Sequence, residues 1–264
     1  MSRIFLIVFG LNLVFLAGCT PHHEPVMETL KLSDLAPAAG TQRPSPKIST
    51  ISIQIHAFEI SAENAEKLDE ISKSLSLQPF RFSQYDSFTA NGFKAGFGRI
   101  SSGDRIIQQL NAAGGQKTAS VSLLLEDGRS DYVPVIRLSA AKNIFYTVTE
   151  DKTISKSIGP GQLSLRITVQ KSPVFRGAYT TTLVPVIPPV FVVPGMPMPD
   201  VAKSDDVVFD SCSFSLQFSP GDFIFLRPVK YAAHGNSLGS LFFSRTGIRP
   251  VVLAFLIVCT DISE

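Results

Sequence analysis

Polar and apolar residues alternate over the first segment that we expect to fold. Between residues 51 and 57, isoleucine and then alanine occupy the odd positions, while Ser52, Gln54 and His56 occupy the even ones. A period of two is typical of a half-buried β-strand, because successive side chains of a strand point to opposite faces. We therefore expect folded structure to start near Ile48 with a strand whose polar side carries a solvated His56.

Two later segments have the spacing of helices. Ser61 is a typical N-cap residue, and apolar residues follow it at helical spacing as far as Leu75. Residues 102–113 have the same character, and Gly114 after them is a typical stop signal. The pattern predicts two short helices in the N-terminal half of the chain.

From residue 117 onward the chain is almost entirely strand-like. Asp127-Gly128 is a hairpin turn signal between the first two of these strands, and Gly159-Pro160-Gly161 marks a later break. The fold class we predict is α+β, mainly antiparallel β with two short helices. The expected strands after the first cover residues 79–88, 92–100, 117–126, 131–139, 143–150, 162–171, 177–187, 206–218, 222–229 and 249–260.

The stretch from Leu183 to Pro199 is apolar but rich in proline. Proline at this density excludes a helix and a central strand, because it lacks the backbone donor that both require. One interpretation is a stiff loop that lies against the body of the protein. The other is an exposed apolar arm that docks on a partner or a membrane. The candidate docking residues are Pro185, Pro188, Pro189, Phe191 and Pro194.

The N-terminus has a pattern of its own. Arg3 precedes an apolar run from Ile4 to Phe15, and Leu-Ala-Gly then leads to Cys19. This run is shorter than the roughly 20 residues of a membrane-spanning helix and is typical of a signal peptide. The arrangement resembles a bacterial lipoprotein signal with its lipobox, which implies cleavage before Cys19 and attachment of lipid, palmitate included, to Cys19. An ordinary secretory signal is the alternative.

These patterns divide the chain into three parts. Residues 1–18 are the predicted signal peptide, and residues 19–47, rich in Pro, Ala, Ser and Thr, are a predicted flexible tether. Residues 48–264 are the α+β domain, in one interpretation two subdomains, 48–160 and 161–264. Since Thr20 replaces the aspartate that retains enteric lipoproteins at the inner membrane, the resemblance favours the outer membrane, facing the periplasm.

Charge and cysteine content narrow the function. The net charge is only +2, and lysine and arginine are scattered, which argues against nucleic-acid binding. Besides Cys19, the chain contains Cys212 and Cys259. In an oxidising compartment these two either form a disulfide or remain buried free thiols, and the sequence leaves both alternatives open.

Motifs with catalytic or metal-binding potential lack their companions. Ser237 lies in a G-x-S-x-G match, but that motif needs a downstream histidine and none follows it. Ser139 and Lys142 match S-x-x-K without the companion elements of that family. The four histidines do not have metal-ligand spacing. We therefore expect no enzyme, metal, cofactor or small-molecule substrate, with a periplasmic serine hydrolase as a remote alternative.

Five segments occur in an order that a known family shares. They are the opening strand Ile51–Ile60, the strand Thr182–Ile187, the glycine turn and apolar strand Ser219–Leu226, the segment Asn236–Phe242 with its L-G-x-L-F pattern, and the apolar strand with its tail, Val251–Ile262. In this order they resemble the β-domain of secretins, the outer-membrane gates of type II and type III secretion and of type IV pili. Asp261 stands where the family's tail has proline, so the resemblance does not extend to a complete gated channel.

The combined prediction is a membrane-anchored envelope lipoprotein with a secretin-like β-domain. We expect the domain to be a non-enzymatic structural or protein-interaction module that binds envelope proteins, or copies of itself, by strand addition at a sheet edge. The alternative is a subunit of an oligomeric outer-membrane pore or secretion channel.

Overall fold

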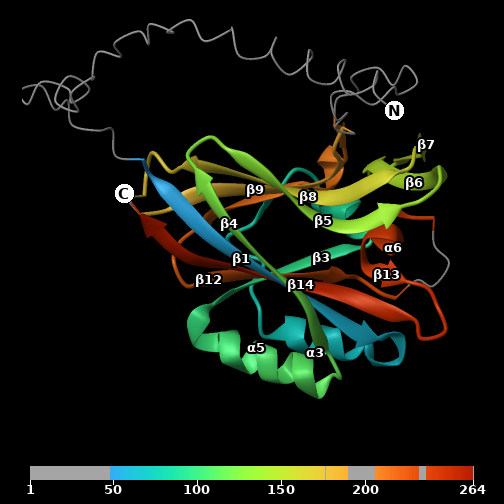
Figure 1. The fold of residues 1–264 in the computed structure, drawn as a ribbon, viewed down its shortest axis with the longest axis horizontal. Coiled ribbons are helices and arrows are strands. Elements are labelled where there is room, and N and C mark those ends of the chain that lie inside the picture. The colour runs from blue at the N-terminus through green and yellow to red at the C-terminus, as the bar shows by residue number, and fades with distance from the viewer. Residues whose placement is uncertain (1–47, 176, 190–205, 232–235, 264) are drawn as a thin grey trace, which may run out of the picture. The chain divides into compact units, whose positions relative to one another are not determined.

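The computed structural model describes residues 48–175, 177–189, 206–231 and 236–263 (Figure 1). The chain separates into Met1–Pro46 and a compact unit, Lys47–Glu264, and all described residues belong to the latter. Its described part is α+β and mainly antiparallel, as the sequence predicts. The described helices are α3 (Lys67–Lys73), α4 (Tyr85–Ala90), α5 (Ile100–Ala112) and α6 (Leu238–Phe243), with short 3-10 turns η2 (Ala62–Asn64) and η3 (Asp210–Cys212).

Two sheets make up most of the unit. The first has the order β3-β12-β14-β1-β4, with β13 added on β14, and the second has the order β2-β11-β9-β8-β5, with β10 added on β9. The first sheet contains β1 (Thr50–Ser61), β3 (Phe93–Arg99), β4 (Gln116–Glu126), β12 (Asp222–Pro228), β13 (Ser244–Arg245) and β14 (Val251–Ser263). The second contains β2 (Arg81–Phe82), β5 (Ser130–Leu138), β8 (Gly161–Lys171), β9 (Tyr179–Ile187), β10 (Val207–Val208) and β11 (Phe214–Phe218), and β6 (Lys142–Thr149) pairs with β7 (Lys152–Ile158) separately.

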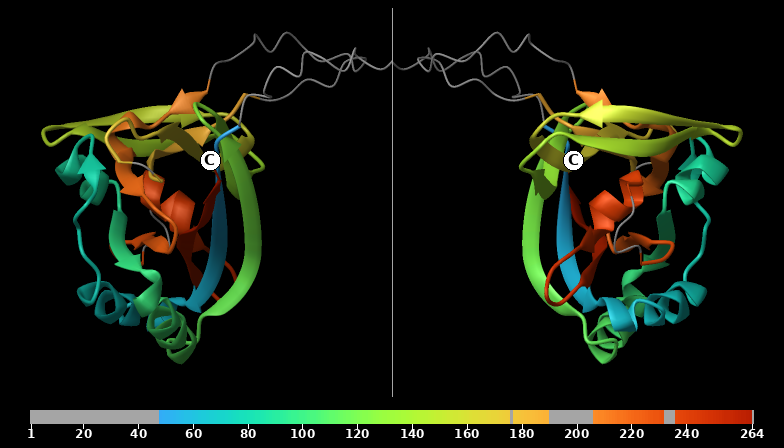
Figure 2. Two further views of the ribbon diagram at one scale, coloured as in Figure 1. Left: turned by 90° about the vertical axis from the view of Figure 1, so that its left-hand side faces the viewer. Right: turned by 90° about the vertical axis from the view of Figure 1, so that its right-hand side faces the viewer.

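The first sheet is the middle layer of three (Figures 1 and 2). One of its faces packs on the second sheet, and Ile51, Ile53 and Ile55 of β1 are buried in that core. The opposite face lies against α3 and α5, where Phe58 and Ile60 join a second core. The first half of β1 therefore buries only the face toward the second sheet. The end that carries Phe58 and Ile60 also buries the opposite face, because the helices cover the sheet only there.

The turn at Asp127-Gly128 is present, but the hairpin predicted around it is wrong. Gly128 has a positive φ of 74°, as the turn signal requires. The two strands that it joins then diverge, since β4 pairs with β1 and β5 pairs with β8. The Gly128 N–H donates to Val169 O at 2.9 Å, so β8 already pairs with the chain within the turn. The turn is thus a corner between the sheets.

The strand predicted over residues 79–88 is also wrong. Only β2 is extended there, and Tyr85–Ala90 forms helix α4. Two interactions favour the helix: Phe88 is buried with its ring 4.9 Å from that of Phe82, and the Asn91 side chain pairs with Thr147. The Asn91 amide donates to Thr147 O at 2.7 Å and accepts from Thr147 N at 2.8 Å. Tertiary contacts have overridden a weak local preference for strand.

Proline did not prevent a central strand in β9. Pro185 lies within β9 opposite Leu165 of β8, contrary to our expectation for residues 183–199. The Pro185 carbonyl accepts from Phe209 N at 3.1 Å, so the missing donor faces away from β8. On that side β9 pairs with β11 up to Leu183 and with β10 from Val186, so proline occupies the gap between two short partners.

The strand predicted over residues 206–218 is interrupted. It consists of β10, the turn η3 and β11, which all adjoin β9 at different points. Phe209 and Cys212 are fully buried at the interruption. The turn therefore places apolar side chains in the core that a continuous strand would have directed to alternating faces.

Substitution by alanine should have opposite effects on stability at two of the glycines. A Cβ at Gly98 in β3 would lie 2.2 Å from the ring of Phe223, which is 1% exposed, whereas a Cβ at Gly103 in α5 meets nothing within 4 Å. We expect Gly98→Ala to lower the free energy of unfolding by about 1–3 kcal/mol. We expect Gly103→Ala to raise it by about 0.5–1 kcal/mol through helix propensity. Urea unfolding of both variants measures the difference, and equal effects would contradict this packing.

Candidate functional site

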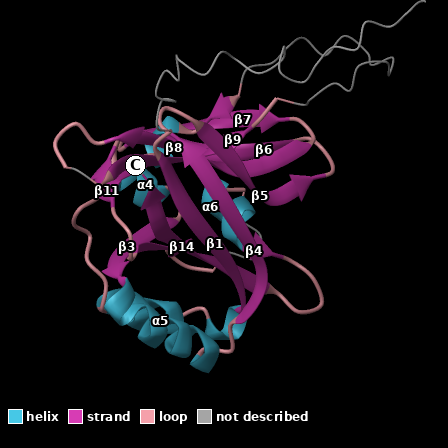
Figure 3. Ribbon diagram, turned by 60° about the vertical axis from the view of Figure 1, so that its left-hand side comes forward, coloured by secondary structure: helices cyan, strands magenta, loops and turns pink. Residues whose placement is uncertain are grey.

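Strand β4 forms one edge of the first sheet (Figure 3). It pairs with β1 along one side, from Glu126 opposite Thr50 to Gln116 opposite Glu59. No strand in the described part of the chain pairs with its other side. An edge of this kind carries a row of backbone donors and acceptors that another strand can use.

A hydrogen bond at the end of β1 shows which backbone groups of β4 are available. The Ala62 N–H donates to Pro250 O at 3.0 Å, in register with the pairing of β1 and β14. Successive residues of an antiparallel strand direct their backbone groups to opposite sides. The backbone groups of even-numbered residues of β1 therefore form hydrogen bonds with β14, and those of odd-numbered residues form hydrogen bonds with β4.

It follows that the outer edge of β4 is formed by Ser120, Ser122 and Leu124. These three residues stand opposite even-numbered residues of β1, so their N–H and C=O groups point away from that strand. The Leu124 side chain is 70% exposed. A shallow groove of about 380 Å³ on the same face includes Ser122 and Leu124. The edge therefore offers both backbone groups and an accessible apolar side chain.

Beyond an irregularity in its register with β1 at Thr118, the β4 edge lacks the features that usually protect an edge strand. Residues 118–125 contain neither a charged residue nor proline, and the charges Lys117 and Glu126 stand at either end. The corresponding edge of the second sheet, β5, contains Pro134 and an irregularity in register between Pro134 and Ile136. Proline and bulges are common means of blocking further pairing. Of these two edges, β4 is the one fitted to accept a strand.

Among the described residues, the one histidine, His56 of β1, contacts β4. His56 Nδ1 lies 3.0 Å from the Ser120 hydroxyl, so the half-buried ring contacts β4. Burial, and then the charge of Lys117, lower the pKa of His56 below its ordinary value. The lowered pKa favours the neutral ring, which adds no charge beside the edge.

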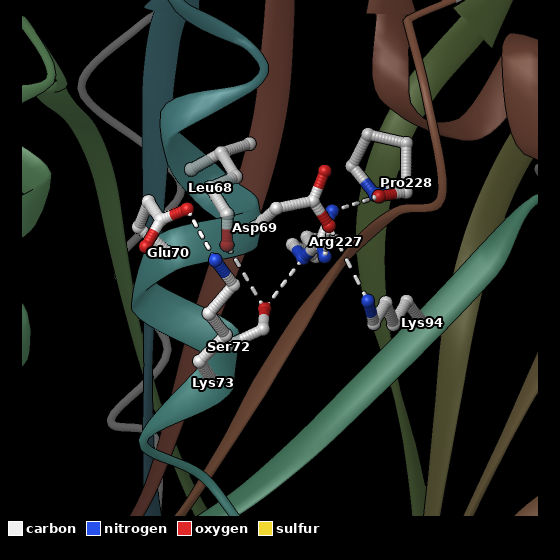
Figure 4. A network of polar contacts seen from close by, with 8 residues as sticks. All are labelled: Leu68, Asp69, Glu70, Ser72, Lys73, Lys94, Arg227 and Pro228. Carbon is white, nitrogen blue, oxygen red and sulfur yellow. Dashed lines mark hydrogen bonds and ion pairs between the residues drawn. The ribbon is translucent and has the colours of Figure 1, made fainter.

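A buried arginine fixes helix α3 to the other face of the first sheet (Figure 4). The side chain of Arg227 in β12 is 2% exposed and bonds to Asp69 of α3 through its guanidinium group. Its Nε donates to Ser72 Oγ at 2.6 Å, and a terminal nitrogen donates to Pro228 O at 2.8 Å. Lys94 Nζ lies 3.3 Å from the Asp69 carboxylate. A buried arginine requires such partners, since an unpaired buried charge is very costly.

Burial and mutual attraction have opposite effects on the pKa values of Asp69 and Arg227. Burial raises the pKa of Asp69, but the hydrogen bonds and charges of Arg227, and then of Lys94, outweigh it and leave the pKa lowered. Burial lowers the pKa of Arg227, and Asp69 opposes this effect. A cleft of about 580 Å³ borders the pair and also includes Glu66, Glu70 and Lys230. With charges of both signs, it favours no one class of ligand, and we interpret the pair as structural.

The predicted site residues have different positions in the structure. Cys19, Phe191 and Pro194 lie outside the described residues. Pro185 is buried within β9, while Pro188 and Pro189 are half-buried after its end. Of the docking segment, Pro185 is thus enclosed in the sheet and two residues are partly accessible.

Cys212 and Cys259 are both free thiols in the structure, and both are fully buried. Burial is the main cause that raises the pKa of each thiol to about 12, with the charges of Asp222 and Asp261 adding to the effect at Cys259. Thiols in this state are inert, because the thiolate is the reactive form.

Ser237 acts as a helix cap in the structure. Its hydroxyl accepts from Ser240 N at 3.2 Å at the start of α6, a helix that we did not expect. The missed signals are two buried phenylalanines of α6 and Gly239, where a Cβ would lie 2.3 Å from Asn91 O. Ser139 lies in an exposed turn between β5 and β6, and Lys142 begins β6.

Among the described residues, no three histidine, cysteine, aspartate or glutamate side chains are grouped so that they could hold a metal ion. Within the same residues, none of the helices has the length and apolar character needed to cross a membrane.

Loss of the Asp69–Arg227 pair should destabilise the protein more than loss of a surface ion pair. Asp69→Asn leaves Arg227 buried without a counter-charge, and we expect the free energy of unfolding to fall by about 1–3 kcal/mol. Glu70→Gln is the matched control, because the Glu70–Lys73 pair on the same helix is about 70% exposed on both sides and is screened by solvent, so its loss should have a much smaller effect.

The stability lost in Asp69→Asn should also depend on pH. A carboxyl with a lowered pKa stabilises the folded state above its ordinary pKa, and this stabilisation is lost as the pH falls through the lowered value. The difference between wild type and Asp69→Asn should therefore be complete at pH 7 and shrink below about pH 4. Urea unfolding at a series of pH values measures it, and a difference that is independent of pH would contradict the pairing.

No protein-family model and no curated protein matches the chain. Two solved structures are similar to it: the secretin domain of InvG from the Salmonella SPI-1 injectisome and the type IV competence pilus secretin PilQ from V. cholerae. The InvG comparison has 11% identity, covers 82% of this chain and 63% of InvG, and has a TM-score of 0.25. The PilQ comparison has 12% identity, covers 82% of this chain and 60% of PilQ, and has a TM-score of 0.22. The chain thus spans less than two thirds of either, and both are secretins.

Proposed function

We propose that the protein is a lipid-anchored module of the bacterial envelope that binds a protein strand along β4. In this proposal Cys19 carries the lipid, residues 19–47 form the tether, and the domain faces the periplasm from the outer membrane. The pattern of residues 3–19, with cysteine at the expected cleavage position, supports the anchor. The role is structural, without catalysis.

The single observation that supports strand binding is the open edge of β4. Ser120, Ser122 and Leu124 direct backbone donors and acceptors outward over a stretch without protecting residues. A strand added there completes these hydrogen bonds, each of which contributes about 0.5–1.5 kcal/mol net. Binding of this kind depends on the backbone and needs few special side chains.

The residues of β4 favour a second copy of the same strand as the partner. If two β4 strands pair antiparallel about Ser122, that residue faces itself, and Leu124 of each copy faces Ser120 of the other. The same register brings Lys117 of one copy close to Glu126 of the other, so opposite charges meet at both ends. A two-fold pairing of this kind closes as a dimer.

The anchor can be tested at Cys19. We expect the wild-type chain to take up labelled palmitate in bacterial cells and to fractionate with membranes. Cys19→Ala should abolish the label, because the acylated thiol is absent. Cys212→Ala is the matched control, since that thiol is fully buried and its loss should leave labelling unchanged. A wild-type chain that takes up no label would overturn the anchor.

The strand-binding edge can be tested by crosslinking through Ser122. Directly opposed residues of a hydrogen-bonded antiparallel pair have Cα atoms about 5.5 Å apart, within the range of a disulfide. We therefore expect Ser122→Cys in the full chain to give a disulfide-linked dimer when cells are treated with a mild oxidant. Asp104→Cys, exposed on α5, is the matched control and should remain monomeric.

A second substitution separates edge pairing from chance collision. Leu124→Lys adds the kind of charge that protects natural edge strands, and it should reduce the Ser122→Cys dimer at least tenfold. Because Leu124 is 70% exposed, the substitution should not change the free energy of unfolding by more than about 0.5 kcal/mol. A crosslink to a different protein would replace the second copy as partner, and no crosslink at all would refute strand binding at β4.

A further inference from the structure

The turn between β8 and β9 exposes two neighbouring apolar side chains. Val174 is 76% exposed and Phe175 is 58% exposed, in a turn between Lys171 at the end of β8 and Tyr179 at the start of β9. Single exposed apolar residues are common on protein surfaces. Two adjacent ones at the tip of a strand pair, one of them aromatic, are a stronger indication of a contact surface.

Hydrogen bonds within the turn fix its conformation. Ser172 is buried, and its N–H donates to Ala178 O at 3.0 Å, which closes the turn. The Ser172 hydroxyl accepts from Phe175 N at 3.1 Å and from Val174 N at 3.4 Å. Gly177 supplies the positive φ of 68° that the turn needs. Hydrogen bonds to Ser172 thus fix the backbone that carries the two exposed side chains.

The tip lies at the end of the domain where the described chain begins (Figure 1). Lys171 Nζ donates to Ser49 Oγ at 3.3 Å, and the Lys171 N–H donates to the Asp127 carboxylate at 2.6 Å. Ile48, next to Ser49, is itself 62% exposed. Three exposed apolar side chains therefore belong to the same end of the domain, the end from which residues 1–47 continue.

The charges at this end do not select an anionic surface. The cationic residues Lys171 and Arg129, with Arg176 next to Phe175 in the sequence, are matched in number by the acidic residues Glu126, Asp127 and Asp261 of the neighbouring turn and of the end of β14. Contact with a lipid surface would thus depend on the apolar side chains rather than on net charge. An apolar tip of two residues is also far smaller than the roughly 800 Å² that each partner of a stable protein complex buries.

We propose that the β8–β9 tip inserts Val174 and Phe175 into the surface of a phospholipid bilayer. The inference rests on the proposed lipid anchor, because the tether joins the domain at Ile48, beside the tip. A short tether keeps its two ends at an effective concentration of about millimolar, so a weak two-residue contact is sufficient. The tip thereby orients the domain relative to the bilayer.

The test measures depth of insertion in the full, lipidated chain. Phe175→Cys is labelled with an environment-sensitive fluorophore, and the protein is reconstituted into phosphatidylethanolamine–phosphatidylglycerol vesicles that contain nitroxide-labelled lipids. We expect a blue shift of the emission and at least threefold quenching. The buried thiols of Cys212 and Cys259 should not label in the folded protein.

The control is an exposed apolar residue at the far end of the same domain. Ile248 is fully exposed and lies just before β14, which begins opposite Ser61, whereas Thr50 at the other end of β1 pairs with Ser263. The two ends of β1 are separated by about 35–40 Å at the rise of a strand. The fluorophore on Ile248→Cys should show neither the shift nor the quenching. Equal quenching at the two positions, or none at Phe175→Cys, would overturn the proposal.

A second set of variants separates insertion from simple proximity to the anchor. With the fluorophore on Ile48→Cys, the double substitution Val174→Asp and Phe175→Asp should reduce quenching at least threefold, while Ile248→Asp should leave it unchanged. Unchanged quenching in the double variant would show that the tether alone places this end, and would overturn the inference. Palmitate incorporation in the same preparation reports on the anchor independently, so failure of the anchor and failure of the tip are distinguishable.

Discussion

Strand β1 binds two neighbours through its backbone and two cores through its side chains. Its even-numbered residues form backbone hydrogen bonds with β14 and its odd-numbered ones with β4. Its first three isoleucines face the second sheet, whereas Phe58 and Ile60 face the helices. The middle layer can form only if both sets of contacts are satisfied together. The open edge of β4 is a direct consequence, because β1 uses one side of β4 and leaves the other side with its donors and acceptors.

Much of this architecture could be predicted from periodicity. The strands over residues 117–126, 162–171 and 222–229 are found within one or two residues of their predicted bounds, and so is the helix that follows residue 100. These segments have clear apolar patterns and standard turn residues, so local preference and tertiary contacts agree. Helix α4, helix α6 and the proline in β9 were missed for the opposite reason. Each depends on a distant partner: Thr147 for Asn91, the Asn91 carbonyl for Gly239, and Phe209 for Pro185.

The sequence predicted the type of binding site, a sheet edge, but not which strand forms that edge. Strand addition at a sheet edge was expected, yet the identity of the edge depends on the order of the strands, which no local pattern records. The predicted hairpin at Asp127-Gly128 would have covered β4 with β5, and only the corner between the sheets leaves β4 open. Arg227 was signalled weakly, as a charged residue in an otherwise apolar strand, but its partner Asp69 lies 158 positions away in the sequence.

The pairing of β1 with β14 has a consequence for the order in which the molecule assembles. The first described strand along the chain pairs with the last, Thr50 opposite Ser263, so the middle layer is incomplete until residues 251–263 have been synthesised. Contacts between such remote segments close slowly, because loop entropy is lost before the contacts form. Helix α5, whose backbone contacts are local, can therefore form before the layer that it covers.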